Sequence, residues 1–238
     1  MSTKIALITG SSRGIGLGLV KEYVQNGYKV LATARNPDKA TELQSFLKEH
    51  NQPPALTMDI SSMASIQACC QELTNENQGV IDILINNAGI SNQDHPDDPA
   101  STCNPEEFDF VQHTNVTGVL MTTQAFLPML EKSNDPKVVN ISSGLGSCTA
   151  SPRFSTTAYQ CSKAALNMLT KCFADEVKRV TFVAIHPGWV QTDMGNSKNR
   201  QAPVSIQASA AGIFRVAKDI SGEKSGGFYN FEGDSIPY

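Results

Sequence analysis

Short apolar runs of strand length alternate along the chain with longer stretches in which apolar residues recur three and four positions apart. The short runs predict strands over residues 4–8, 29–34, 55–58, 80–85, 137–141 and 180–186 and near 228–231. The longer stretches predict helices from Ile15 to about Gly27 and over residues 38–49, 63–73, 105–130, 159–177 and 205–217. This alternation indicates a doubly wound parallel sheet of about seven strands with helices on both faces. We expect one α/β domain over residues 1–238.

Composition excludes several classes of protein. Hydrophobic residues make up 40% of the chain and charged residues 18%, which are ordinary globular values. The net charge of −4, without a run of Lys or Arg, argues against a nucleic-acid partner or an anionic membrane surface. No apolar run reaches the roughly 18 residues of a membrane span. The cysteines form no Cys-x-x-Cys pair and the histidines are scattered, so we expect a cytoplasmic protein without a metal site.

Three glycines separate the first predicted strand from the first predicted helix. A tight turn there brings free backbone N–H groups to the positive end of the helix dipole, and the missing side chains let a pyrophosphate approach. The strand, turn and helix therefore predict a dinucleotide-binding turn. Its expected contacts are Gly10, Ser12, Arg13, Gly14, Ile15 and Gly16.

Two arginines indicate which dinucleotide binds. The second predicted strand ends at Ala34-Arg35, where a fold that prefers NAD carries an acid for the ribose 2′-hydroxyl. A guanidinium at that position suits a 2′-phosphate instead, and Arg13 in the glycine turn can reach the same group. The two arginines predict NADP(H) as the cofactor.

The ends of two later strands carry the candidate catalytic chemistry. Asn86-Asn87-Ala88-Gly89 offers amides beside small residues, which let a ligand lie close to the backbone. Ser143 follows the end of the fifth strand, and Tyr159 and Lys163 share a helix face because they are four residues apart. A nearby ammonium favours phenolate and is expected to lower the pKa of Tyr159. Ser143 is expected to hold a substrate oxygen while Tyr159 transfers the proton.

Taken in the order in which they occur, the motifs of this sequence resemble those of the short-chain dehydrogenase/reductase family along nearly the whole chain. The matching motifs are Thr9 to Gly16, Asp59, Asn86 to Gly89, Asn115, Ser143, Tyr159 with Lys163, and Pro187-Gly188 leading to Thr192. The resemblance implies that Tyr159 is the general acid of carbonyl reduction and that Ser143 polarises the carbonyl. It also implies that Lys163 binds the nicotinamide ribose and lowers the pKa of the tyrosine. Asn115 is implied to hold a water in the proton relay to Lys163.

The same resemblance implies the remaining cofactor contacts. Asp59 and Ile60 flank the adenine, and Asn86, Ala88 and Gly89 contact the adenosine side and the ribose. The nicotinamide and its carboxamide are covered by Pro187, Gly188, Val190 and Thr192. The interval from Ser143 to Tyr159 is longer than the commonest family spacing, and the extra residues around 151–157, with Phe154, are expected to form a substrate-facing loop.

Within the family the chain is most similar to sniffer-type carbonyl reductases and C-factor-like proteins. The similar stretches are Arg13 to Val20, His186 to Gly195 and Gly222 to Asn230. The resemblance implies an NADPH-dependent carbonyl reductase acting on a small ketone or aldehyde. Two alternatives stay open: a dedicated 3-oxoacyl or steroid dehydrogenase, and an NADPH-binding sensor or signalling protein with low turnover. The apolar helices over residues 105–130 and 159–177, which form a subunit interface in the family, predict a homodimer or homotetramer.

Overall fold

Seven parallel strands form one sheet in the computed structural model, which describes residues 3–76, 79–91, 98–150, 156–197 and 200–238. The strand order is β3-β2-β1-β4-β5-β6-β7, and each neighbouring pair is parallel. The chain order reverses beside β1, so the carboxyl ends of β1 and β4 flank the crevice where ligands bind in such sheets. The strands are β1 Ile5–Ile8, β2 Lys29–Ala34, β3 Leu56–Thr57, β4 Ile83–Asn86, β5 Lys137–Ile141, β6 Thr181–His186 and β7 Phe228–Asn230.

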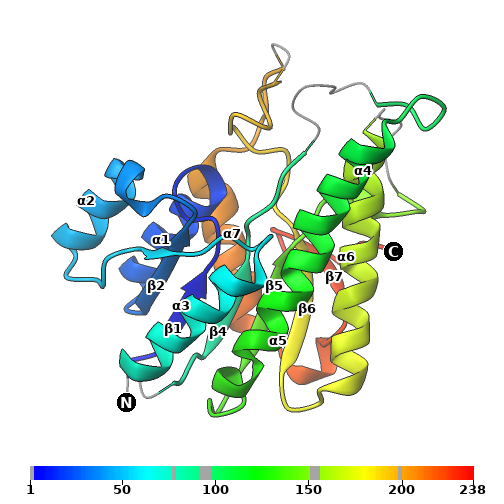
Figure 1. Cartoon of the computed structure of the whole chain (residues 1–238). Helices are drawn as coiled ribbons and strands as arrows, with labels where there is room; N and C mark the ends of the chain where they lie inside the picture. The colour runs from blue at the N-terminus through cyan, green and yellow to red at the C-terminus, as the bar shows by residue number, and fades with distance from the viewer. Residues whose placement is uncertain (1–2, 77–78, 92–97, 151–155, 198–199) are drawn as a thin grey trace.

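Helices cover both faces of the sheet (Figure 1). They are α1 Gly14–Gln25, α2 Thr41–Glu49, α3 Met63–Glu76, α4 Pro105–Gln112, α5 Gly118–Leu130, α6 Thr157–Glu176 and α7 Ile206–Asp219. One face is packed by α1, α2 and α7 and the other by α3, α5 and α6. The doubly wound fold predicted from the hydrophobic pattern is therefore confirmed. Among the residues described, no helix combines the length and apolar character that a bilayer crossing requires.

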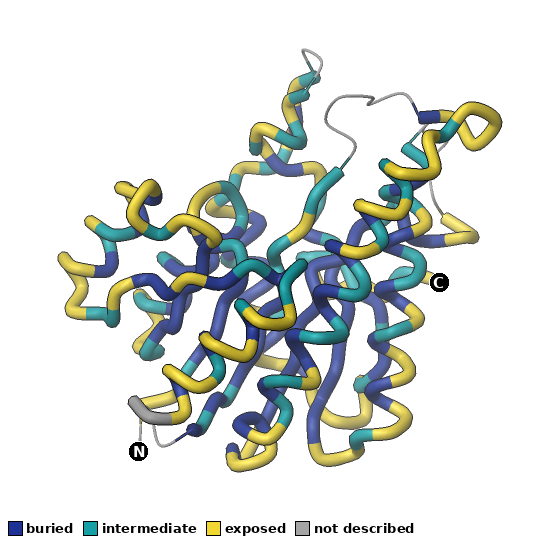
Figure 2. Tube along the Cα trace, viewed as in Figure 1, coloured by how far each residue is buried: buried dark blue, intermediate teal, exposed yellow. Residues whose placement is uncertain are grey.

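Each face of the sheet has its own apolar core, because alternate strand residues point to opposite faces. On β1, Ala6 and Ile8 face the core beneath α1 and α7, whereas Leu7 faces the core beneath α3 and α5. The strands are buried almost throughout, and exposure is confined to the outer helix faces and the loops (Figure 2). This burial on both sides explains why the strands read as continuous apolar runs.

The stretch predicted as one helix over residues 105–130 is helical throughout, but it is not a single regular α-helix. A π-helical turn, η2 His113–Thr117, separates α4 from α5. Inside that turn Asn115 is 1% exposed, and its amide oxygen accepts a hydrogen bond from the Ile90 N–H at 2.8 Å. A π turn adds a residue to the helix and turns the following side chains, a device common at functional sites. Pro128 lies inside α5 and does not end it, because the helix continues to Leu130.

Candidate active site

The turn between β1 and α1 has no space for a side chain at Gly10 or Gly16. Gly10 and Gly14 have φ angles of +67° and +58°, in the left-handed region that favours glycine. A Cβ on Gly10 would lie 2.8 Å from Ala88 Cα, and one on Gly16 would lie 2.2 Å from the Gly10 carbonyl oxygen. Arg13 occupies the N-cap position of α1 and makes no side-chain cap. The backbone N–H groups of the first turn therefore remain available for an anion.

Asn87 ties this turn to the end of β4. Its amide nitrogen donates to the carbonyl oxygens of Thr9 at 2.9 Å and Gly10 at 3.1 Å. In return, Thr9 Oγ1 accepts from the backbone N–H groups of Asn87 and Ala88, each at 3.0 Å. Sequence reasoning did not give Asn87 a role of its own. The available signal was that consecutive residues of a strand end point to opposite faces, so Asn86 and Asn87 must serve different neighbours.

The side chains of two predicted cofactor contacts are directed into the interior. Asn86 is 2% exposed, and its amide nitrogen donates to Thr123 Oγ1 at 3.1 Å and Asn140 Oδ1 at 2.8 Å. Ile60 is 5% exposed and packs within the core, where a Cβ on Gly118 would lie 3.3 Å from Ile60 Cδ1. Because these side chains point inward, the predicted contacts of Asn86 and Ile60 with a cofactor would use main-chain atoms.

Arg35 and Asp59 follow the neighbouring strands β2 and β3. Burial acts to raise the pKa of Asp59, but hydrogen bonds from Ser61 and the charges of Arg35 and His113 outweigh it, so this pKa is lowered. The Asp59 carboxylate accepts from the Ser61 N–H at 2.9 Å and from the Ser61 hydroxyl at 2.7 Å. Arg35 itself is exposed. A guanidinium therefore stands open to solvent where the predicted 2′-phosphate would lie.

Ser143, Tyr159 and Lys163 form one cluster between β5 and the start of α6. Ser143 hydrogen-bonds the Tyr159 hydroxyl. The Lys163 ammonium is 5.5 Å from the centroid of the Tyr159 ring and donates to the Ile141 carbonyl oxygen at 2.9 Å. The neighbouring Ser142 points away, because its hydroxyl donates to Asn167 Oδ1 at 2.6 Å in the interior. Of the two adjacent serines, Ser143 is thus the one beside the tyrosine.

Burial shifts the pKa values of Tyr159 and Lys163 from their ordinary values in opposite directions. It raises the pKa of Tyr159 to about 12, with the hydrogen bond from Ser143 acting against the rise. It lowers the pKa of Lys163 to about 8. The net effect of the surroundings is thus to raise the pKa of Tyr159, and the expectation that the Lys163 ammonium acts to lower it stays a prediction. At neutral pH Tyr159 therefore carries its proton, as a general acid must.

Asn115 joins this cluster to the end of β4. Its amide nitrogen donates to Ser162 Oγ at 3.0 Å and to the Ile90 carbonyl oxygen at 2.8 Å. A Cβ on Gly89 would lie 3.2 Å from Asn115 Oδ1 and 3.7 Å from Lys163 Nζ, so the glycine allows the close approach of both groups. The structure thus brings Asn115, Gly89 and Lys163 together, as the resemblance implies.

The segment after β6 folds back toward the glycine turn. The Pro187 carbonyl oxygen accepts from Ser209 Oγ on α7 at 2.7 Å, which anchors the start of the segment. Farther along, a Cβ on Gly14 would lie 3.3 Å from the Thr192 methyl group. Next to it, Arg13 Nη1 and Asp193 Oδ2 form an exposed ion pair at 2.7 Å. Residues 187–193 therefore lie against the turn that is predicted to hold the cofactor.

His186, the last residue of β6, is a half-buried neutral histidine beside the catalytic cluster. Its Nδ1 atom is buried without a hydrogen-bond partner among the described residues. A Cβ on Gly144, directly after Ser143, would lie 3.4 Å from the His186 ring. Burial lowers the pKa of His186 to about 4. The imidazole thus packs uncharged against the backbone that presents Ser143.

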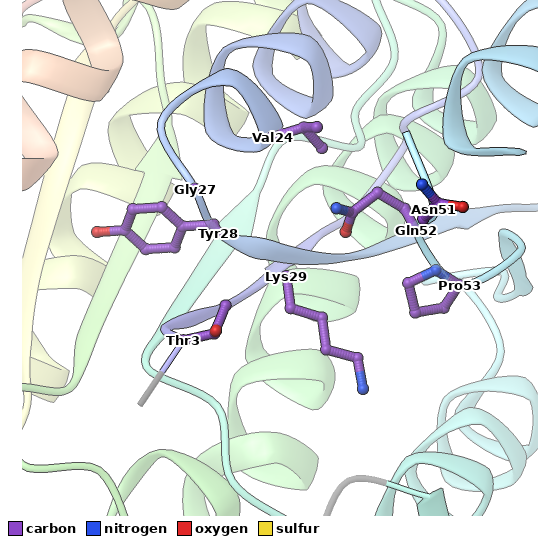
Figure 3. A pocket seen from close by; sticks show the side chains of 8 residues that line it. All are labelled: Thr3, Val24, Gly27, Tyr28, Lys29, Asn51, Gln52 and Pro53. Atoms are coloured by element: carbon purple, nitrogen blue, oxygen red, sulfur yellow. The ribbon is translucent and has the colours of Figure 1, made fainter. Parts of the chain in front are cut away.

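A separate hollow of about 500 Å³ lies at the opposite edge of the sheet, near the amino ends of β1, β2 and β3 (Figure 3). It is lined by Thr3, Val24, Gly27, Tyr28, Lys29, Asn51, Gln52 and Pro53. None of the predicted site residues lines it. The candidate active site is thus separate from this hollow and lies at the carboxyl ends of the strands.

Of the substrate-facing loop predicted around residues 151–157, residues 151–155, including Phe154, lie outside the described residues.

The fold and site define an oxidoreductase built on a dinucleotide-binding sheet, and comparisons with known proteins agree. The model of the short chain dehydrogenase family matches residues 4–203, and the chain belongs to this family. An uncharacterised oxidoreductase of Schizosaccharomyces pombe is 35% identical, with both chains covered completely.

Two solved structures share the fold over the full length of both chains. The NADPH-bound carbonyl reductase from chicken fatty liver has a TM-score of 0.93 and 33% sequence identity. The carbonyl reductase Sniffer of Drosophila melanogaster has a TM-score of 0.91 and 29% identity. The similarity to sniffer-type carbonyl reductases that the motifs indicated is therefore confirmed.

Proposed function

We propose that this protein is an NADPH-dependent carbonyl reductase in which Tyr159 is the general acid. The observation that carries the proposal is the cluster of Tyr159, Ser143 and Lys163 at the carboxyl edge of the sheet. There the phenol is hydrogen-bonded to Ser143 and protonated at neutral pH. Carbonyl reduction needs such a proton source beside a hydrogen-bond donor for the substrate oxygen. The chicken carbonyl reductase, which binds NADPH, supports the choice of cofactor and reaction.

The residues around the glycine turn fit NADP(H). The turn has positive φ angles and close backbone contacts that a Cβ would fill, which suits a pyrophosphate. Arg35 at the end of β2 and Arg13 in the turn are both exposed and suit the 2′-phosphate. Residues Pro187, Gly188, Val190 and Thr192 would enclose the nicotinamide side, with Asp59, Ala88 and Gly89 near the adenosine and ribose. When bound, NADPH supplies the hydride for the carbonyl carbon.

Arg13 must exchange one partner for another in this proposal. It pairs with Asp193 at 2.7 Å, and both side chains are mostly exposed. Exposed ion pairs contribute only about 0–1 kcal/mol. A phosphate dianion can therefore replace the Asp193 carboxylate at little cost.

The proton transfer follows from the positions of the three side chains. Ser143 holds the carbonyl oxygen of the substrate, and Tyr159 gives its phenolic proton to that oxygen as the alcohol forms. The Lys163 ammonium, 5.5 Å from the tyrosine ring centroid, stabilises the phenolate left behind. Asn115, placed beside Lys163 by the π turn, is proposed to support the return of a proton to the tyrosine.

The test is NADPH consumption with a panel of quinones, diketones, aldehydes, steroid ketones and 3-oxoacyl thioesters. We expect turnover that needs Tyr159 and that is much slower with NADH. A strong preference for one 3-oxoacyl or steroid substrate would identify a dedicated dehydrogenase. Tight NADPH binding without turnover of any panel member, or turnover unchanged in Tyr159→Phe, would contradict the proposal and favour the sensor function.

We also propose that the protein is cytoplasmic and forms a homodimer or homotetramer through α4, α5 and α6. Phe110 on α4 and Met168 on α6 are 57% and 63% exposed, which is unusual for large apolar side chains. Sedimentation at micromolar concentration is expected to show a dimer or larger species. Replacing Phe110 and Met168 by Ser should shift it toward monomer, and a wild-type monomer would refute this assembly.

A further inference from the structure

The helix that carries Tyr159 lacks a cap of its own. Thr156 occupies the N-cap position of α6, and its side chain makes no cap hydrogen bond. The Thr156 hydroxyl is buried without a partner among the described residues, and the first turn contains no acidic side chain. The first turn of an uncapped helix leaves N–H groups unsatisfied and is the part most prone to fray. Tyr159 lies in this turn, three positions after Thr156.

Asp98, about sixty residues earlier in the chain, supplies the missing cap. Its Oδ2 atom accepts a hydrogen bond from the Ala158 N–H at 3.1 Å. Its carbonyl oxygen accepts from the Thr157 N–H at 3.0 Å and from the Thr157 hydroxyl at 2.6 Å. Asp98 and Thr156 also pair as an isolated parallel bridge. Two of the free N–H groups of α6 are thus satisfied by a single residue outside the helix.

The burial of Asp98 distinguishes it from an ordinary surface acid. It is 5% exposed, in a segment that is otherwise polar and largely open to solvent. A buried carboxylate is expensive unless charged or polar donors surround it. The N-terminus of α6 provides backbone donors and the positive end of the helix dipole, and the carboxylate stabilises that end in return.

The segment that contains Asp98 lies between the starts of two helices. Cys103 Sγ donates to Asp98 Oδ2 at 3.3 Å, and Asn104 Oδ1 caps α4 by accepting from the Glu107 N–H at 3.0 Å. From the other side, Gln112 Nε2 on α4 donates to the Ala158 carbonyl oxygen at 2.9 Å. Figure 1 shows α4 and α6 side by side, with the green loop of residues 98–104, which leads into α4, at their upper ends. A shift of residues 98–104 would therefore reach the first turn of α6 through Asp98.

We infer that Asp98 is a positioning residue for Tyr159: it caps the catalytic helix from a distant segment and holds the first turn in the geometry that proton transfer needs. This inference rests on the proposed function of Tyr159. Asp98 does not belong to the glycine turn or the segment after β6, so it acts on catalysis and not on cofactor binding.

The test compares Asp98→Ala with Asp98→Asn and with a matched control. Loss of a cap typically costs about 1 kcal/mol, which converts to roughly a five- to tenfold fall in kcat if Tyr159 loses its geometry. We expect that fall in Asp98→Ala, with the KM for NADPH unchanged within about twofold. Asp98→Asn keeps the acceptor oxygen and should recover most of the lost kcat. The control, Asn104→Ala, removes the cap of α4 and should leave kcat at the wild-type value.

Amide hydrogen exchange provides a readout that does not depend on turnover. In the protein without cofactor, Asp98→Ala should accelerate exchange at residues 157–160 by roughly the same five- to tenfold, and Asn104→Ala should accelerate it only at the start of α4. Unchanged exchange at 157–160, or an equal fall in kcat in Asn104→Ala, would overturn the inference. If Asp98→Ala does not fold, Asp98→Asn is compared with wild type instead: it keeps the acceptor oxygen but loses the charge at the helix terminus, so exchange at residues 157–160 should accelerate by a smaller factor, about twofold, and unchanged exchange would again overturn the inference. A wild-type protein without reductase activity would refute the proposed function, whereas the exchange data would still decide whether Asp98 holds this turn.

Discussion

The two halves of the candidate site are held in place by different means. The cofactor half, around Gly10 and Gly16, depends on close backbone contacts that exclude any side chain. The catalytic half, around Ser143, Tyr159 and Lys163, depends on buried side-chain hydrogen bonds from residues such as Asn115 and Ser162. The first half should therefore be sensitive to added atoms, and the second to the loss of polar atoms.

The largest effect should follow from a methyl group added to the cofactor half. In Gly16→Ala the new Cβ would lie 2.2 Å from the Gly10 carbonyl oxygen and 2.5 Å from Asn87 Nδ2. Backbone must move to relieve this contact, at a typical cost of about 1–3 kcal/mol. We expect NADPH affinity to fall by at least about tenfold, with a lower melting temperature, measured by fluorescence titration and calorimetry.

The matched control is Gly222→Ala, where a Cβ meets nothing within 4 Å. It should leave both affinity and melting temperature at wild-type values. A normal NADPH affinity in Gly16→Ala would contradict the view that this half depends on backbone contacts.

The second effect should follow from removing polar atoms in the catalytic half. Asn167 accepts from Ser142 Oγ at 2.6 Å and donates to the Gly146 carbonyl oxygen at 3.3 Å. Asn167→Leu removes this donor from the Gly146 carbonyl oxygen and leaves Ser142 Oγ with the longer hydrogen bond to the Lys163 carbonyl oxygen at 3.5 Å, at a cost of about 1–3 kcal/mol. We expect kcat to fall by roughly tenfold while NADPH affinity stays unchanged. Steady-state kinetics measures kcat and a cofactor titration measures the affinity for NADPH. If Asn167→Leu lowered both by the same factor, the two halves of the site would not depend on different interactions.

The third effect is a pH dependence that belongs to the catalytic half. Burial lowers the pKa of Lys163 to about 8, whereas that of Tyr159 is about 12. Below the lysine pKa both groups carry their protons, and as pH rises through it Lys163 loses the charge that stabilises a phenolate. The kcat/KM for reduction, which reports the free enzyme, should be level below this pKa and fall above it. A profile that rises through the same range would contradict the assigned roles.

The smallest effect concerns stability and the neutral imidazole beside Ser143. Burial lowers the pKa of His186 to about 4 from its ordinary 6.5. Between these values the unfolded chain binds a proton that the folded protein does not, so stability falls as pH decreases. The contribution is complete above the ordinary pKa and is lost as pH falls through the folded one. Denaturant unfolding of His186→Asn should show a weaker loss between pH 6.5 and 4 than wild type, and equal slopes would exclude this role.

The contrast between the two halves also explains what the sequence could predict. Glycines that exclude a side chain are visible in the chain itself, so the turn from Gly10 to Gly16 followed directly from their spacing, and the alternation of strands and helices followed from the hydrophobic pattern. Hydrogen-bond partners of side chains depend on which distant residues meet. For that reason the π turn around Asn115, the inward direction of Asn86, the link from Asn87 to the glycine turn and the cap from Asp98 required the structure. The spacing of Tyr159 and Lys163 likewise shows that they share a helix face, but the burial that raises the pKa of Tyr159 required the structure.

The central claim is that Tyr159 protonates a carbonyl oxygen while NADPH reduces the carbon. It is tested most directly by a single turnover with NADPH deuterated at the transferred position and the best carbonyl substrate of the panel. The account predicts that deuterium appears on the former carbonyl carbon with the wild-type protein, and that Tyr159→Phe binds NADPH normally but slows this transfer by orders of magnitude. Transfer at the wild-type rate in Tyr159→Phe would contradict the account.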